Sequence, residues 1–320
     1  MKFITVPENY APLDEGLVYD IDLEGLTESA DVSVINAEDD TAVATLRFAQ
    51  TAFISLDIAP YVQRMFDPRP ADGPAGISID RGRTVTVVVA VAGKRTPERR
   101  FTMLHVGSRP RLLTTMPARR TISAGESDEV AIYAPDGGRL TVNTASDSGT
   151  ESQTIELAAD SSIRRLNIAT RELPADFNTI DVVFEAGEWT ERLHYDRVLR
   201  PRNAVRLAWT AASGAIERYT FHVRRTTKSV AKESFCNRDG HRTASVACRK
   251  SALAVSDYEP AATIEALEEI LSARRVWRTD GERAEMVEVV STETILRFDG
   301  ELNALTIEIG DAREGGEVRL

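Results

Sequence analysis

Apolar and polar residues alternate along much of this chain with a period of two residues. The alternation is clear over residues 41–48 and 53–58, and residues 83–91 are rich in Val and Thr. Gly, Pro, Asp or Asn residues separate further short segments of this kind, at 129–133, 140–143, 154–157, 163–168, 179–184 and 188–195. A two-residue period places alternate side chains on opposite faces of a strand. The sequence therefore predicts a mainly β chain of short strands and turns.

Two segments have the pattern of a helix instead. Residues 59–66 form a short one with Pro60 in its first turn, where the missing amide N–H costs nothing. Residues 262–275 form the main helix, in which acidic residues come first and Arg274 and Arg275 come last, as the helix dipole favours. Its apolar face consists of Ile264, Leu267, Ile270 and Leu271.

The chain is long enough for two or three domains. It has 320 residues, and domains usually contain roughly 100–200 residues. Linker-like segments near residues 107 and 201 divide it into an N-terminal β-sandwich over 1–107, a second β-sandwich over 108–200 and a C-terminal α+β domain over 201–320. The size and strand pattern of the first two segments are typical of immunoglobulin-like domains.

Charge and cysteine usage exclude several classes of protein. The net charge is −11, which argues against nucleic-acid binding over the whole surface. No apolar run reaches about 18 residues, and the N-terminus lacks a secretory signal pattern, so we expect a protein made in the cytoplasm without membrane insertion. Two cysteines do not make a disulfide framework.

Residues 206–223 have the pattern of a hairpin with defined apolar anchors. Ser213 and Gly214 supply the break between two strands, and the apolar anchors are Trp209, Ile216, Tyr219, Phe221 and Val223. Leu207, Trp209, Gly214, Tyr219 and Phe221 form the pattern Leu-x-Trp-x-x-x-x-Gly-x-x-x-x-Tyr-x-Phe. This pattern resembles the opening of the C-terminal domain in structural proteins encoded by phage and prophage tail gene clusters of gut bacteria. The helix at 262–275 and the segments 286–290 and 302–309 follow in the order of that group.

The resemblance implies a non-enzymatic structural component of a virion tail, tail tip or adaptor. Such a protein would be made in the host cytoplasm and located in the virion. Its expected partners are other tail proteins and copies of itself. A ring is one arrangement that such copies could form. The resemblance implies no active site. The alternative is a carbohydrate-binding or adhesion module with immunoglobulin-like domains and a host surface glycan as ligand.

A basic stretch stands out in this acidic chain. Only Glu217, Glu233 and Asp239 oppose its bases, which are Arg218, Arg224, Arg225, Lys228, Lys232, Arg238, Arg242, Arg249 and Lys250. The stretch is either an electrostatic docking surface or a solvated loop balanced by acidic residues of the main helix. The bases are not interleaved with aromatic residues as a platform for stacking single-stranded nucleic acid would require, so a protein partner is favoured over DNA. Most of it lies in a long insertion, 226–257, which is either an ordered arm or a mobile loop.

Few residues have a spacing that suggests chemistry. Cys236, His241 and Cys248 are compatible with zinc, with a disulfide or with two ordinary thiols, and their spacing lacks the short Cys-x-x-Cys knuckle of structural zinc sites. Trp189 follows a Gly turn and is a candidate for stacking on a sugar ring. We find no nucleophile motif, phosphate-binding loop or dinucleotide fingerprint, and we expect no catalytic residue, metal or cofactor.

Overall fold

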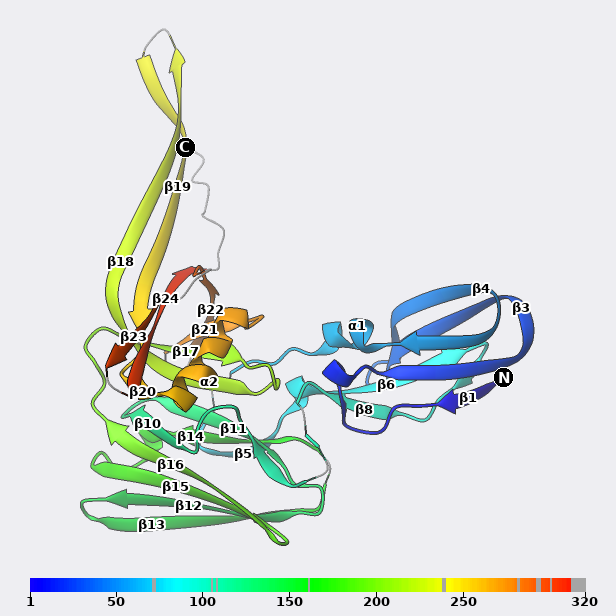
Figure 1. The fold of residues 1–320 in the computed structure, drawn as a ribbon, viewed down its shortest axis with the longest axis horizontal. Helices are drawn as coiled ribbons and strands as arrows, with labels where there is room; N and C mark the ends of the chain where they lie inside the picture. The colour runs from blue at the N-terminus through cyan, green and yellow to red at the C-terminus, as the bar shows by residue number, and fades with distance from the viewer. Residues whose placement is uncertain are drawn as a thin grey trace.

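The computed structural model describes residues 1–70, 73–104, 106–107, 109–160, 162–237, 240–280, 283–291, 295–299 and 301–311. Strands dominate these ranges, and they form four sheets in three parts of the molecule (Figure 1). Two α-helices occur within the same ranges, α1 (Ala59–Val62) and α2 (Ala261–Ser272). The predicted mainly β fold is confirmed.

The N-terminal part is one bent sheet. Glu24 and Gln50 have positive φ angles of 59° and 47°, and the register of the longest strand pair shifts between Asp22 and Thr27. The bend lets both halves of the sheet cover a single core. The strands are β1 (Lys2–Thr5), β2 (Ala11–Pro12), β3 (Val18–Asn36), β4 (Thr41–Asp57), β6 (Thr84–Val91), β7 (Lys94–Arg95) and β8 (Arg99–Thr102).

Two details of this part differ from the sequence prediction. The segments 41–48 and 53–58 belong to one continuous strand, β4, because the chain bends at Gln50 without leaving the sheet. The short helix is divided into α1 and a 3-10 turn, Gln63–Met65, which bury Val62 and Phe66 against the core.

The second part is a two-sheet β-sandwich. One sheet has the order β10 (Arg119–Ser123), β16 (Trp189–Val198), β15 (Phe177–Ala186), β12 (Gly138–Ser146) and β13 (Gly149–Leu157). The other has the order β5 (Gly76–Ile79), β14 (Arg164–Ala169), β11 (Ser127–Tyr133) and β9 (Arg111–Leu113). Inward residues of both sheets, among them Ile132, Phe184 and Tyr195, share one core.

One strand crosses the predicted boundary at residue 107. The boundary assigns residues 76–79 to the first domain, but β5 pairs with β14 of the second sandwich from Ile79 opposite Arg164 to Gly76 opposite Asn167. This pairing depends on a contact between segments far apart in the sequence, which the local pattern does not indicate.

The third part is a sheet that closes on itself, with α2 packed into its core. β19 pairs with both β18 and β24, which completes a ring through β17, β21 and β22. Ile264, Leu267 and Ile270 of α2 share the core with Trp209 and Phe221. The strands are β17 (Ala204–Thr210), β18 (Ile216–Asn237), β19 (Gly240–Val255), β20 (Glu259–Pro260), β21 (Val276–Asp280), β22 (Arg283–Val289), β23 (Ile295–Asp299) and β24 (Leu302–Asp311).

Candidate assembly surface

A two-stranded arm extends from the closed sheet (Figure 1). β18 and β19 pair from Arg225 opposite Leu253 out to Asn237 opposite Gly240. The inner ends of these strands also pair with β17 and β24, whereas the outer segments, 224–237 of β18 and 240–250 of β19, pair only with each other in the described part of the chain. We call these outer segments the arm. Residues 226–237 and 240–250 of the predicted insertion are therefore paired strands of the arm, and residues 251–255 belong to the closed sheet.

The described side chains of the arm form no hydrophobic core of their own. Its described side chains are exposed except that of Val246, which is half-buried, and none belongs to a hydrophobic cluster of the described residues. An isolated two-stranded ribbon is only marginally stable in water. Contact with another molecule would therefore stabilise the arm.

Most of the predicted basic residues lie on the arm. Arg238 and the side chain of Arg242 are outside the described part of the structure. Six bases are exposed, and none has a carboxylate partner among the described residues: Arg224, Arg225, Lys228, Lys232, Arg249 and Lys250.

The strand register divides these bases between two faces. Directly paired residues of an antiparallel ribbon share a face. One face, which we call the lysine face, carries three successive pairs: Lys228 with Lys250, Val230 with Cys248, and Lys232 with Val246. The opposite face carries Arg225, Thr227, Ser229, Ala231, Arg249 and Ser251. Like charges directly opposite each other destabilise a ribbon, so the Lys228–Lys250 pair favours an anionic partner.

Arg218 does not belong to this surface, which corrects the prediction. It lies where β18 is still within the closed sheet, and only 3% of the residue is exposed. Its guanidinium donates to the Glu129 carboxylate of β11 at 2.8 Å, and Arg83 of the N-terminal part donates to the same carboxylate. Strand alternation turns Arg218 toward the second sandwich, so its charge serves an internal ion pair.

Further buried ion pairs lie where the sandwich meets the closed sheet. Arg206 is 3.2 Å from Glu126, and Arg120 is 3.4 Å from Asp128 and 3.7 Å from Glu217. Burial raises the pKa of Glu217, and the nearby Arg120 opposes that shift. Sequence reasoning missed this network because its members come from strands distant in the chain. Pairing satisfies charges that would otherwise be costly to bury.

The cysteines do not come together. Neither forms a disulfide. Cys236 is opposite His241, but Cys248 is opposite Val230, six residues away along β18. At about 3.3 Å per residue that separation is about 20 Å, too far for a shared tetrahedral zinc or a disulfide. The described residues contain no cluster that could hold a metal ion.

His194 lies between two carboxylates on the outer face of the sandwich. Its Nδ1 is 2.6 Å from Asp181 Oδ1, and its Nε2 is 3.2 Å from Asp196 Oδ1. The hydrogen bond with Asp181 raises the pKa of His194 above its ordinary value. Asp196 also accepts from Arg119 at 2.7 Å, so the cluster is held by several partners. Both ring nitrogens of His194 therefore have a carboxylate partner.

Trp189 is partly exposed at the start of β16. Its exposed fraction is 43%, and the Arg109 guanidinium carbon lies 4.6 Å from the ring centroid. One face of the indole is therefore covered by a cation in a cation–π arrangement. A sugar ring would have to use the other face or displace Arg109.

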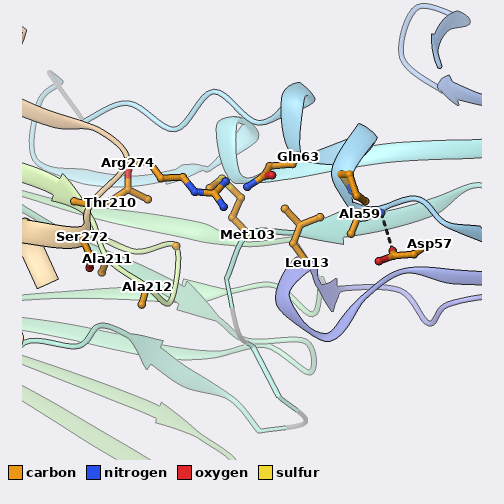
Figure 2. A pocket seen from close by; sticks show the side chains of 13 residues that line it. Leu13, Asp57, Ala59, Gln63, Met103, Thr210, Ala211, Ala212, Ser272 and Arg274 are labelled. Atoms are coloured by element: carbon orange, nitrogen blue, oxygen red, sulfur yellow. Dashed lines mark hydrogen bonds between the residues drawn. The ribbon is translucent and has the colours of Figure 1, made fainter.

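A cavity of about 430 Å³ lies between the N-terminal and C-terminal parts (Figure 2). Ala59, Gln63 and Met103 line one side, and Thr210, Arg274 and neighbouring small residues line the other. The Asp57 carboxylate at its edge accepts the backbone N–H groups of Leu17 and Ala59, at 2.8 and 2.9 Å. The lining contains no histidine or cysteine, so Ser272 has no histidine base beside it there.

Comparison with known proteins identifies no relative by sequence. No protein-family model matches the chain, and no curated protein sequence matches it either. None of the described helices has both the length and the apolar character needed to cross a bilayer.

Several solved structures resemble the chain weakly. The complex of Dpr2 Ig1-Ig2 with DIP-Theta Ig1-Ig3 is 10% identical at a TM-score of 0.21, over 99% of this chain and 90% of that one. Drosophila OTK extracellular domains 3–5 are 7% identical at a TM-score of 0.24, over 75% of this chain and 85% of that one. Trypsin-activated alpha-2-macroglobulin from Escherichia coli is 8% identical at 0.22, over 96% of this chain and 21% of that one. At such TM-scores these likenesses carry no inference about partners or activity.

Proposed function

We propose that this chain is a structural protein that acts by assembly, as a tail, tail-tip or adaptor component of a phage virion, and not by catalysis. The observation that carries the assembly role is the arm. It projects from a folded domain, and within the described residues its side chains form no core of their own and its bases have no carboxylate partner. A ribbon of this kind gains stability when it packs on another molecule.

Charge supports a second copy of the chain as one partner. Residues 224–250 contain eight Lys and Arg residues against Glu233 and Asp239, in a chain of net charge −11. The rest of each molecule is therefore strongly acidic, and a basic arm of one copy is attracted to the acidic body of the next. Other tail proteins are the further proposed partners.

Assignment to a virion tail rests on the resemblance of residues 206–223 to structural proteins of phage tail gene clusters. The structure supports the use of that segment as a packing element, because Trp209 and Phe221 are fully buried in the third core. Location in the virion is part of the same proposal.

Light scattering and electron microscopy of the purified protein test the assembly role. The matched variant lacks residues 228–250 and joins Thr227 to Ser251 through Asn-Gly, because these two residues are directly paired and a two-residue turn closes such a pair. We expect oligomers, including rings or discs, from the wild type, and monomers with an unchanged melting temperature from the variant. A monomeric wild type at every concentration would contradict the proposal.

A carbohydrate-binding or adhesion module is the second candidate. The observation that favours it is the 43% exposed indole of Trp189. A glycan array probed with the wild type and with Trp189→Ala tests it. Binding by the wild type that the variant loses would support this function, and absence of binding by both would remove it.

A further inference from the structure

The outer face of the N-terminal sheet combines carboxylates with exposed apolar side chains. In the β3–β4 pair, Tyr19 and Ile21 point into the core and are fully buried. The alternate residues face outward in three paired rows: Val18 with Asp57, Asp20 with Ser55, and Asp22 with Phe53. We call these six residues the aspartate face.

Two large apolar side chains of the aspartate face are exposed. Phe53 is 51% exposed and Val18 is 39% exposed. They lie at opposite corners of the face, with the polar row of Asp20 and Ser55 between them. The sheet beneath is well packed, so this face is a fixed surface rather than a frayed edge.

Two carboxylates of this face, those of Asp22 and Asp57, are held by backbone groups rather than by bases: Asp22 accepts the Glu24 N–H at 2.7 Å. No base of the described residues forms an ion pair with Asp20, Asp22 or Asp57. Lys2 of β1 is opposite Asp22, and the three aspartates outnumber it. Asp57 also accepts two backbone N–H groups through one oxygen, so its charge is fixed in position.

The lysine face of the arm has the complementary composition. Lys228, Lys250 and Lys232 surround Val230, which is 47% exposed. Both faces repeat every second residue along a strand pair, so charged and apolar groups recur at about 7 Å on each. An apolar contact bordered by charges of opposite sign is the usual composition of a specific interface.

We propose that the lysine face of one copy docks on the aspartate face of the next copy. This contact rests on the proposed assembly function and specifies the surfaces that it uses. The two faces cannot meet within one molecule, because the arm and the N-terminal sheet extend in different directions from the middle of the molecule (Figure 1). A contact between two different surfaces is head-to-tail, and such contacts build rings when they close and filaments when they do not.

Charge reversal on each face tests this contact in the full-length protein. The arm variant is Lys228→Glu with Lys250→Glu, and the sheet variant is Asp20→Lys with Asp22→Lys. Each variant alone places like charges at the contact, and we expect the concentration for half-assembly to rise by about tenfold or more in light scattering. An equimolar mixture restores both contacts, because each reversed face then meets its opposite charge, so assembly should recover.

The control for the arm variant is Arg225→Glu with Arg249→Glu, which makes the same charge change on the opposite face. It should assemble within about twofold of the wild type, because its charges lie away from the contact. If the sheet variant fails to fold, Ser55→Lys adds a positive charge to the same face and keeps the Asp22 carboxylate, which accepts the Glu24 N–H. Melting temperatures of all variants show whether each remains folded.

The outcomes separate this inference from the proposed function. The wild type is expected to assemble, and loss of the arm is expected to prevent assembly. If both hold but neither Asp20→Lys with Asp22→Lys nor Ser55→Lys weakens assembly, the assembly role stands. The aspartate face is then not the surface on which the arm docks. Pairing of arm with arm would give that result. Recovery in the mixture supports the contact. Assembly only after addition of DNA or of another particle protein would overturn it.

Discussion

Gly214 is in the tight turn before β18, and two physical constraints meet there. Its φ is +81°, and a Cβ atom at this position would lie 2.4 Å from the backbone oxygen of Met103. Turn geometry therefore favours glycine, and so does the close approach of the N-terminal part. The sequence alone predicts the constraint from the turn geometry, but not the close approach of Met103.

Gly214→Val should destabilise the third part strongly. The valine would need an unfavourable left-handed backbone and would also displace Met103. We expect a lower melting temperature, measured by circular dichroism. Gly187→Val is the control, since Gly187 has φ +59° but no neighbour within 4 Å of the added Cβ. Equal losses in the two variants would show that packing on Met103 contributes nothing.

Trp209→Ala should lower the stability of the third part by about 3–5 kcal/mol, the usual cost of deleting a large buried aromatic side chain. Trp209 is 0% exposed and belongs to the same core as α2. Chemical denaturation measures the change. Trp189→Ala is the matched control, because its indole is 43% exposed and outside the core clusters of the described residues. An unchanged midpoint for Trp209→Ala would contradict the packing.

His194 should make stability depend on pH. Hydrogen bonding to Asp181 raises its pKa above 6.5, so its contribution is fully present below pH 6.5 and is lost as pH rises through the raised pKa. His194→Gln should therefore be less stable than the wild type at low pH and equal to it at high pH. Thermal unfolding between about pH 5 and 9 measures this difference. A difference that is constant with pH would contradict the raised pKa.

At the scale of the element, the arm should be the least protected part of β18. Amides of residues 226–236 lie outside the closed sheet, whereas those of 216–222 pair with β17. Local opening is easiest where few apolar contacts oppose it. Hydrogen exchange should be fast at the arm in the dilute monomer and slow after assembly. Protection that does not change with protein concentration would place the arm outside the contact.

At the scale of the molecule, buried ion pairs tie the three parts together. The Glu129 carboxylate of the second part binds Arg83 of the first and Arg218 of the third. A mixed apolar cluster adds to this junction, with Tyr10, Leu113 and Ala215 among its members. We therefore expect the three parts to unfold together.

Glu129→Ala should weaken that cooperativity, because it leaves two buried guanidinium groups without this carboxylate. Breaking a buried pair by removing one partner costs about 3–5 kcal/mol. Calorimetry should show one transition in the wild type, and a lower or divided transition in the variant. Glu156→Ala is the control, because its pair with Arg139 is exposed. A single, unshifted transition in Glu129→Ala would contradict the role of the junction.

The sequence by itself determined the mainly β class, the burial of Trp209 and the main helix, because these depend on local periodicity. Alternation did not reveal β3, since its acidic residues and Gly25 interrupt the pattern. The bases of the arm were predictable as a group, but their division into two faces depends on register with β19. The burial of Arg218, the transfer of β5 to the second sandwich and the aspartate face were decided by the tertiary structure. Each of them depends on contacts between distant segments, and local periodicity carries no information about such contacts.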